Sequence, residues 1–180
     1  MWFDAHGDLN TPETSPTGFF DGMALAIAVG RWWKEAVNGL QWFTPVSESR
    51  VLHLGARDFD PGESRLIDES EIEVVTAKQV RAGLEPILSP RRADIRDVYL
   101  HLDLDVLDTK EGKANGYATA DGLSSDELAT AVSEIDTAFV IRAAALTAYD
   151  PSFDTGKNIA RIAIRIATQL ASAQAPSAAH

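Results

Sequence analysis

Short apolar runs alternate with amphipathic stretches along most of the chain. Runs rich in β-branched and other apolar residues occupy 50–54, 72–75, 97–105 and 138–148. Runs of this kind, alternating with helical patterns, predict parallel strands whose connecting helices cover the faces of the sheet. The apolar triplet at 1–3 indicates the end of one more buried strand, although three residues make an unusually short one. The pattern therefore predicts an α/β fold with a mostly parallel sheet.

Three stretches have the composition or the periodicity of helices. Ser124 and Glu127 have the spacing of a capping box, which predicts a helix through about Glu134. An alanine-rich stretch over 22–37 predicts a second helix. The strongest pattern places one apolar face on a helix near the end of the chain, formed by Ile159, Ile162, Ala163, Ile166, Ala167 and Leu170. We expect one domain over 1–171 and a flexible tail over 172–180.

The composition narrows the class of protein and of partner. A chain of 180 residues with 45% hydrophobic and 24% charged residues is typical of one soluble domain. Its net charge of −11 argues against binding to nucleic acid or to an anionic membrane surface, and favours a cation as partner. We find neither a secretion signal nor an apolar run of ~20 residues, so we expect a cytoplasmic protein. Since there is no cysteine, any metal site has to use carboxylates and histidines.

Two acidic clusters follow apolar runs and could form such a site. The first holds Asp4, His6 and Asp8, which share one side if strand alternation continues; the second holds Asp103 and Asp105. Ligands of open parallel sheets bind beyond the carboxyl ends of the strands, so both clusters could meet at one rim. Carboxylates with imidazole suit manganese first, and also magnesium, iron or zinc. The plainer interpretation is that these acids are solvated loop residues that cap helices.

These segments resemble the ureohydrolase family, which comprises arginases, agmatinases and formimidoylglutamases. The sequence Asp-Ala-His-Gly-Asp at 4–8 resembles the central metal motif of that family, and the aspartates at 103, 105 and 108 resemble its second metal motif. The segments 55–63 and 150–156 resemble the intervening segment and the one before the last helix. The resemblance implies a three-layer α/β/α, arginase-like fold, of which this chain would be the carboxyl-terminal portion without the amino-terminal part.

The resemblance also implies a role for individual residues. Asp4 and Asp103 would bridge two manganese ions, Asp8 would complete one ion, and His6 and Asp105 the other. In that family a water acidified by the two cations attacks a guanidinium or amidine carbon, and Asp8 would take and pass on its proton. The resemblance places substrate contacts at Asn10, Ser15, Thr17, Asp58, Asp60 and Glu63. Each of these outer residues is explained equally well by an ordinary loop hydrogen bond.

Two departures from the family concern the metal ions and the proton. The family's first metal ligand is a histidine upstream of the central motif, in a position that would precede Met1. His53 and His101 are candidates to substitute, but we expect His101 beside the metal without binding it and His53 packed in a strand. Asp21 stands where the family has a proton-shuttling histidine. A carboxyl needs a raised pKa to protonate a leaving amine at pH 7.

Two further departures concern the substrate. Ala148 replaces the glutamate that pairs with the guanidinium group, so we expect that neither arginine nor agmatine is the substrate. Tyr117 and Asp121 replace a threonine and a glycine in the loop over the active site. We therefore expect a manganese-dependent hydrolase of a linear amidine with altered specificity, acting on a small molecule and forming a homo-oligomer, as family members commonly do. The alternatives are a catalytically impaired pseudoenzyme or assembly partner, and a single-zinc, deacetylase-like hydrolase.

Overall fold

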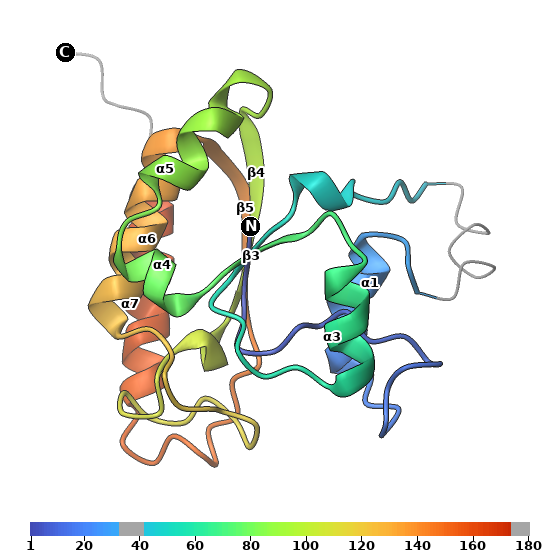
Figure 1. Ribbon diagram of the computed structural model, residues 1–180. Helices are drawn as coiled ribbons and strands as arrows, with labels where there is room; N and C mark the ends of the chain where they lie inside the picture. Colours follow the sequence, from blue (N-terminus) through green and yellow to red (C-terminus); the bar gives the residue numbers. More distant parts are fainter. Residues whose placement is uncertain (33–41, 174–180) are drawn as a thin grey trace.

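Five parallel strands form the centre of the molecule (Figure 1). The computed structural model describes residues 1–32 and 42–173. The strands lie in the order β3-β2-β1-β4-β5, and every pairing between them is parallel. Their bounds are β1 Trp2–Phe3, β2 Leu52–Leu54, β3 Glu73–Val75, β4 Asp97–Asp103 and β5 Val140–Thr147. The predicted α/β class is confirmed.

Helices cover both faces of this sheet (Figure 1). On one face lie α4 Ala77–Arg81, α5 Glu85–Leu88, α6 Ser125–Ala138 and α7 Asn158–Ala173; on the other lie α1 Ala24–Ala28 and α3 Pro61–Asp68. Each face has its own buried apolar cluster, the larger one beneath α4 to α7. The architecture is therefore the predicted three-layer α/β/α sandwich.

The shortest strand occupies the middle of the sheet. Trp2 pairs with His53 of β2 and His101 of β4, and Phe3 is fully buried. The two side chains contribute to opposite apolar clusters, as strand alternation requires. A two-residue strand holds here because a neighbour on each side supplies hydrogen bonds, which an edge position would not provide.

The helices at the carboxyl end follow the predicted pattern. The side chain of Ser124 accepts a hydrogen bond from the Glu127 amide at the start of α6, and α7 contains the whole predicted apolar face. Residues 172 and 173 still belong to α7, while 174–180, the rest of the predicted tail, lie outside the described residues. Sequence patterning did not identify α3, α4 or α5, which are short.

Two predicted elements end earlier than expected. The helix predicted over 22–37 begins with a 3-10 turn at Asp21–Met23, continues as α1 and ends at Ala28. Gly30, with φ +77°, turns the chain there, and the prediction from residue 33 onward lies outside the described residues. The strand predicted over 97–105 ends at Asp103, and a 3-10 turn follows at Leu104–Val106. Among the described residues, no helix is long and apolar enough to cross a membrane.

Candidate metal centre

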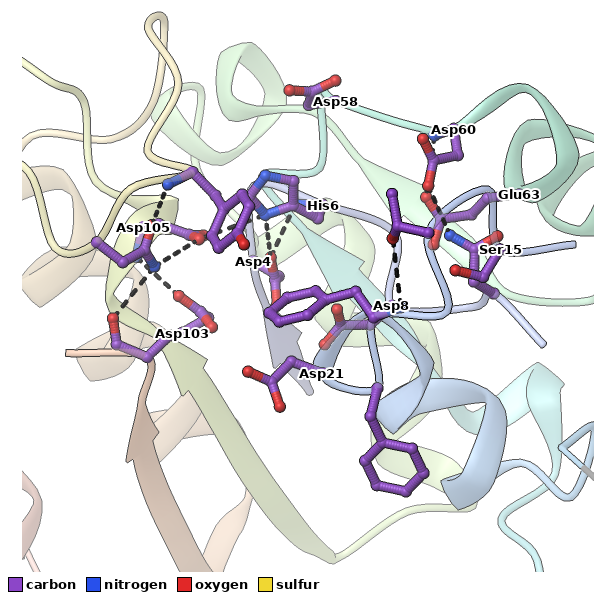
Figure 2. Close-up of a pocket in the computed structure, with 18 of the residues that line it drawn as sticks. Asp4, His6, Asp8, Ser15, Asp21, Asp58, Asp60, Glu63, Asp103 and Asp105 are labelled. Atoms are coloured by element: carbon purple, nitrogen blue, oxygen red, sulfur yellow. Dashed lines mark hydrogen bonds and ion pairs between the residues drawn. The ribbon is translucent and has the colours of Figure 1, made fainter. Parts of the chain in front are cut away.

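The strand order fixes where a ligand can bind. From β1 the chain adds β2 and β3 on one side of the sheet, then crosses back to add β4 and β5 on the other. The connections leave β1 and β4 in opposite directions, and a crevice opens between them at their carboxyl ends. A pocket of about 940 Å³ lies there, with Asp4 directly after β1 and Asp103 at the end of β4 (Figure 2).

The residues to which the sequence gave a metal, proton-transfer or substrate role line this one pocket, whereas Asp108 and the two strand histidines, His53 and His101, do not. They come from the segments 4–21, 58–63 and 103–105: Asp4, His6, Asp8, Asn10, Ser15, Thr17, Asp21, Asp58, Asp60, Glu63, Asp103 and Asp105. Figure 2 labels all of them except Asn10 and Thr17 and shows the labelled side chains around a common space. The lining also includes residues with no assigned role in the prediction, notably Phe19, Phe20, Asn115, Tyr149 and Asp150. The two acidic clusters therefore meet, as predicted from the ends of parallel strands.

The local geometry of the first cluster differs from the predicted alternation. Strand β1 ends at Phe3, so Asp4, His6 and Asp8 lie on a loop. The His6 amide donates to Asp4 Oδ1 at 2.8 Å, and Asp8 adopts a left-handed conformation with φ +55°. Such a conformation is costly for a residue other than glycine, and its retention beside a pocket points to function. A turned loop, and not a strand, makes the three side chains converge.

The second cluster is also turned. Asp103 Oδ1 accepts the Asp105 amide at 2.9 Å, which starts the 3-10 turn and redirects Asp105. Asp105 Oδ1 accepts the amide of Ala5 at 3.2 Å, and Oδ2 accepts the side-chain amide of Asn115 at 3.1 Å. Asp105 thus joins the two clusters to each other and to the 115 loop. Asn115 was not predicted, because nothing in its local sequence marks this contact.

The imidazole of His6 lies between two carboxylates. Its Nδ1 is 3.3 Å from Asp105 Oδ2 and 3.4 Å from Asp4 Oδ1. Burial disfavours a charge on His6, but the hydrogen bonds with Asp105 and Asp4 outweigh it and raise its pKa from 6.5 to about 11. Burial acts against the Asp105 carboxylate as well, and the His6 contact overcomes it, so the pKa of Asp105 falls to about 2.

Asp103 and Asp8 have no imidazole partner of this kind. Burial, and then the charge of Asp4, raise the pKa of Asp103 to about 9. Burial and the neighbouring Asp4 also raise the pKa of Asp8 well above its usual value. Asp4 is 1% exposed, and its Oδ2 has no hydrogen-bond partner among the described residues. A buried acceptor without a donor is costly, and a cation satisfies it.

The donor set therefore fits divalent cations. Donor atoms of Asp4, His6 and Asp105 lie within 4.8 Å of one another, and so do donor atoms of Asp4, His101 and Asp103. Both groups share Asp4, which is the residue with the unsatisfied oxygen. Oxygen-rich sets with imidazole suit manganese, iron or zinc better than calcium.

Several predicted substrate contacts already have partners within the protein. Glu63 is 3% exposed, and its two oxygens accept the amides of Leu9 at 2.8 Å and Asp60 at 3.3 Å. A Cβ at Gly7 would overlap the Glu63 carboxylate, which explains the glycine of the first motif. The side-chain amide of Asn10 donates to Asp60 Oδ2 at 2.9 Å. Glu63 and Asn10 thus stabilise the loops at the pocket through hydrogen bonds within the protein.

The mouth of the pocket is aromatic and hydroxylated. The rings of Phe19 and Tyr117 approach with centroids 5.1 Å apart, although 98 positions separate them in sequence. The Ser15 and Thr17 hydroxyls accept the amides of Gly18 and Phe19 and so form the turn that carries this aromatic edge. Asp21 and Asp58, like Ser15 and Thr17, line the pocket, and both are exposed.

Arg57 is a residue that the sequence did not single out. Its guanidinium crosses from the end of β2 to the turn of Asp105 and the loop near 120, and it donates to the carbonyl oxygens of Gly55, Asp105, Val106, Leu107, Thr119 and Ala120 at 2.8–3.4 Å. Carbonyl groups from three segments are thus held by one rigid fork of donors. No local pattern predicts this, since the partners lie up to 63 positions away.

The two strand histidines differ in their surroundings. His53 is fully buried, as predicted, and its Nε2 lies 3.1 Å from the Gly7 carbonyl oxygen. His101 is 9% exposed and lies parallel to the Trp2 indole, with ring centroids 3.7 Å apart. Burial lowers the pKa of each imidazole to about 4, so both are neutral at pH 7.

Comparison with known proteins decides the family. The family model described as the arginase family matches residues 1–172. The chain belongs to the arginase family. It is 33% identical over 175 residues to an arginase of Bacillus subtilis, a match covering 94% of this chain and 59% of that protein. The resemblance inferred from the metal motifs is confirmed.

Solved structures of arginases share the fold. The Bacillus caldovelox arginase superposes with a TM-score of 0.83 at 31% identity, covering 94% of this chain and 58% of that one. A formimidoylglutamase of Bacillus subtilis superposes with a TM-score of 0.77 at 19% identity, over 99% of this chain and 53% of that one, which supports the fold alone. The chain thus spans about 59% of the length of the arginases it matches.

Proposed function

We propose that this arginase-family chain is a manganese-dependent hydrolase that cleaves a C–N bond in a linear amidine. The observation that carries the proposal is the convergence of Asp4, His6, Asp8, Asp103 and Asp105 at the switch point of the sheet, around a buried carboxylate oxygen without a partner. Two manganese ions would occupy this centre. When bound, they would lower the pKa of a water molecule and polarise the substrate.

The protein's own groups would orient the reactants and move the proton. The carboxylate of Asp8 would accept the proton of the attacking water, and the left-handed backbone conformation of Asp8 holds that carboxylate at the pocket. Asn115 and Arg57 would hold the Asp105 turn in place during the reaction. Asp21, exposed at the rim, is the candidate group for returning a proton to the leaving nitrogen.

The pocket favours a small cationic substrate. Apart from the five candidate metal ligands, its lining carries Asp21, Asp58, Asp60, Glu63 and Asp150, and no lysine or arginine among the described residues. An amidinium group carries a positive charge, which this field attracts. Ala148, at the lining, supplies no carboxylate to pair with a guanidinium, so we propose that arginine and agmatine are poor substrates.

A panel assay tests the function. The purified chain, loaded with Mn²⁺, is incubated with formamidines, guanidino acids and guanidino amines, and released ammonia, formamide and urea are measured. We expect manganese-dependent hydrolysis of an amidine, lost in Asp8→Asn and retained in Asp97→Asn, a control at the far end of β4. Absence of product from every compound in the fully loaded protein contradicts the proposal.

A further inference from the structure

His101 is held rigidly beside the acidic clusters. It lies on β4 two positions before Asp103, so strand alternation puts both side chains on the same side. The Trp2 ring of the neighbouring strand stacks on it with an interplanar angle of 8°. A stacked, 9% exposed imidazole has few orientations available, which makes it preorganised for a contact.

Strand β5 also positions the His101 ring, through a contact with one of its nitrogen atoms. His101 Nε2 lies 3.2 Å from Oγ1 of Thr147, which is the register partner of Asp103 on β5. Imidazoles that bind metal ions are commonly oriented by a hydrogen bond of this kind to one ring nitrogen. His101 is therefore positioned from β1 and from β5 at once.

The distances among three donors fit a single ion. One donor atom each of His101, Asp4 and Asp103 lie within 4.8 Å of one another. Donors that bind one ion at roughly 2.0 to 2.3 Å can lie at most about 4.6 Å apart, so small adjustments suffice for coordination. Asp4 carries the buried oxygen without a partner among the described residues. His53, the other strand histidine, belongs to no such group within the described part of the chain.

We propose that His101 is a direct ligand of one of the ions, which it binds together with Asp4 and Asp103. The inference rests on the proposed metal-dependent function and departs from our sequence-based expectation that His101 lies beside the metal without binding it. With His6 in the other donor group, each group then contains one imidazole and two carboxylates. An imidazole in each group favours manganese, iron or zinc over magnesium.

The variant His101→Phe tests the assignment, because phenylalanine can keep the stacking on Trp2 and has no nitrogen. Mn²⁺ binding is measured by isothermal titration, with stoichiometry checked by elemental analysis. We expect one of two Mn²⁺ equivalents to weaken at least tenfold, since even the partners of metal ligands contribute about 10- to 100-fold. We also expect the preference for Mn²⁺ over Mg²⁺ to decline. Val98→Ala, a core change on the same strand, controls for lost stability and should bind as the wild type.

A second measurement needs no substitution at His101. Electron spin echo spectroscopy detects nitrogen nuclei bound to Mn²⁺, and His6→Gln removes the imidazole of the other group. We expect the imidazole nitrogen signal to persist in His6→Gln; its loss there overturns the assignment of His101. Unchanged binding of two Mn²⁺ by His101→Phe overturns it as well and leaves the proposed function intact. A wild-type chain that binds no Mn²⁺ overturns both.

Discussion

His6 and Asp105, from loops about 100 positions apart, lie with Nδ1 and Oδ2 at 3.3 Å. This contact holds the two metal motifs together when no cation is bound. It also keeps the His6 imidazole protonated, because the pKa of His6 rises to about 11, and the nearby Asp103 has a pKa of about 9. Metal-free protein therefore carries protons at positions where a cation would bind.

Because these groups keep their protons in the folded state, the folding stability of the metal-free protein should depend on pH. Above pH 8 the folded state holds a proton on His6, and partly on Asp103, that the unfolded chain has released. Stability therefore falls as pH rises. The decline in stability is expected only above pH 8. Burial lowers the pKa of the amino terminus from 8.0 to about 6, so below pH 8 the amino terminus makes stability rise with pH.

We expect the unfolding free energy in EDTA to fall by about 1 kcal/mol between pH 8 and pH 9, after allowance for the partial exposure of His6. Thermal melts at both pH values measure it, and His6→Gln should show a smaller decline. Saturating Mn²⁺ should cancel the trend, because binding is favoured as the ligands lose their protons. A melting temperature in EDTA that rises over this interval disagrees with the arrangement of His6 and its neighbours.

Asp103→Ala should abolish stabilisation by manganese. Asp103 ends β4 at the switch point and belongs to a candidate donor group. A ligand at about 100 times its Kd stabilises the folded state by about 2.7 kcal/mol, or roughly 5 to 10 °C for a chain of this size. Differential scanning fluorimetry with and without Mn²⁺ measures the shift. Asp97→Ala, an exposed change on the same strand, should retain the full shift.

Arg57→Met should loosen the metal centre as well as the fold. The guanidinium holds carbonyl groups of the Asp105 turn and of the loop near 120, so its loss leaves several acceptors without donors. We expect a stability loss of about 2–3 kcal/mol and weaker Mn²⁺ binding at temperatures well below unfolding. Arg57→Lys should recover part of both. Arg91 donates to a different carbonyl oxygen, that of Ile87. Arg91→Met removes this hydrogen bond and should lower the free energy of unfolding without changing Mn²⁺ affinity.

Ala148→Glu should improve the cleavage of guanidinium substrates. Ala148 lines the pocket with φ +58°, and its carbonyl accepts the side-chain amide of Asn115. A charge-assisted hydrogen bond of about 1.5–3 kcal/mol predicts a 10- to 100-fold rise in kcat/KM for arginine or agmatine. Release of urea measures it, with Ala143→Glu on exposed β5 as the control. Efficient cleavage of arginine by the wild type would contradict the proposal that Ala148, in place of a glutamate, makes arginine a poor substrate.

The sequence predicted the sheet and the place of the site because both depend on local patterns. Apolar runs marked all five strands within a few residues, and the ends of parallel strands brought Asp4 and Asp103 to one rim. The turned geometry of Asp8 and Asp105 escaped prediction, since alternation was extended past the ends of β1 and β4. Arg57 and Asn115 escaped too, because their partners are distant in sequence.

The metal content of the folded chain is the most direct test of the proposed manganese centre. The protein is incubated with excess Mn²⁺, freed of unbound metal, and analysed by inductively coupled plasma mass spectrometry against protein concentration. We expect about two manganese ions per wild-type chain and a clear loss of manganese in Asp103→Ala. A folded wild-type chain that retains no manganese, or takes up a single zinc ion in its place, would contradict the proposed manganese centre.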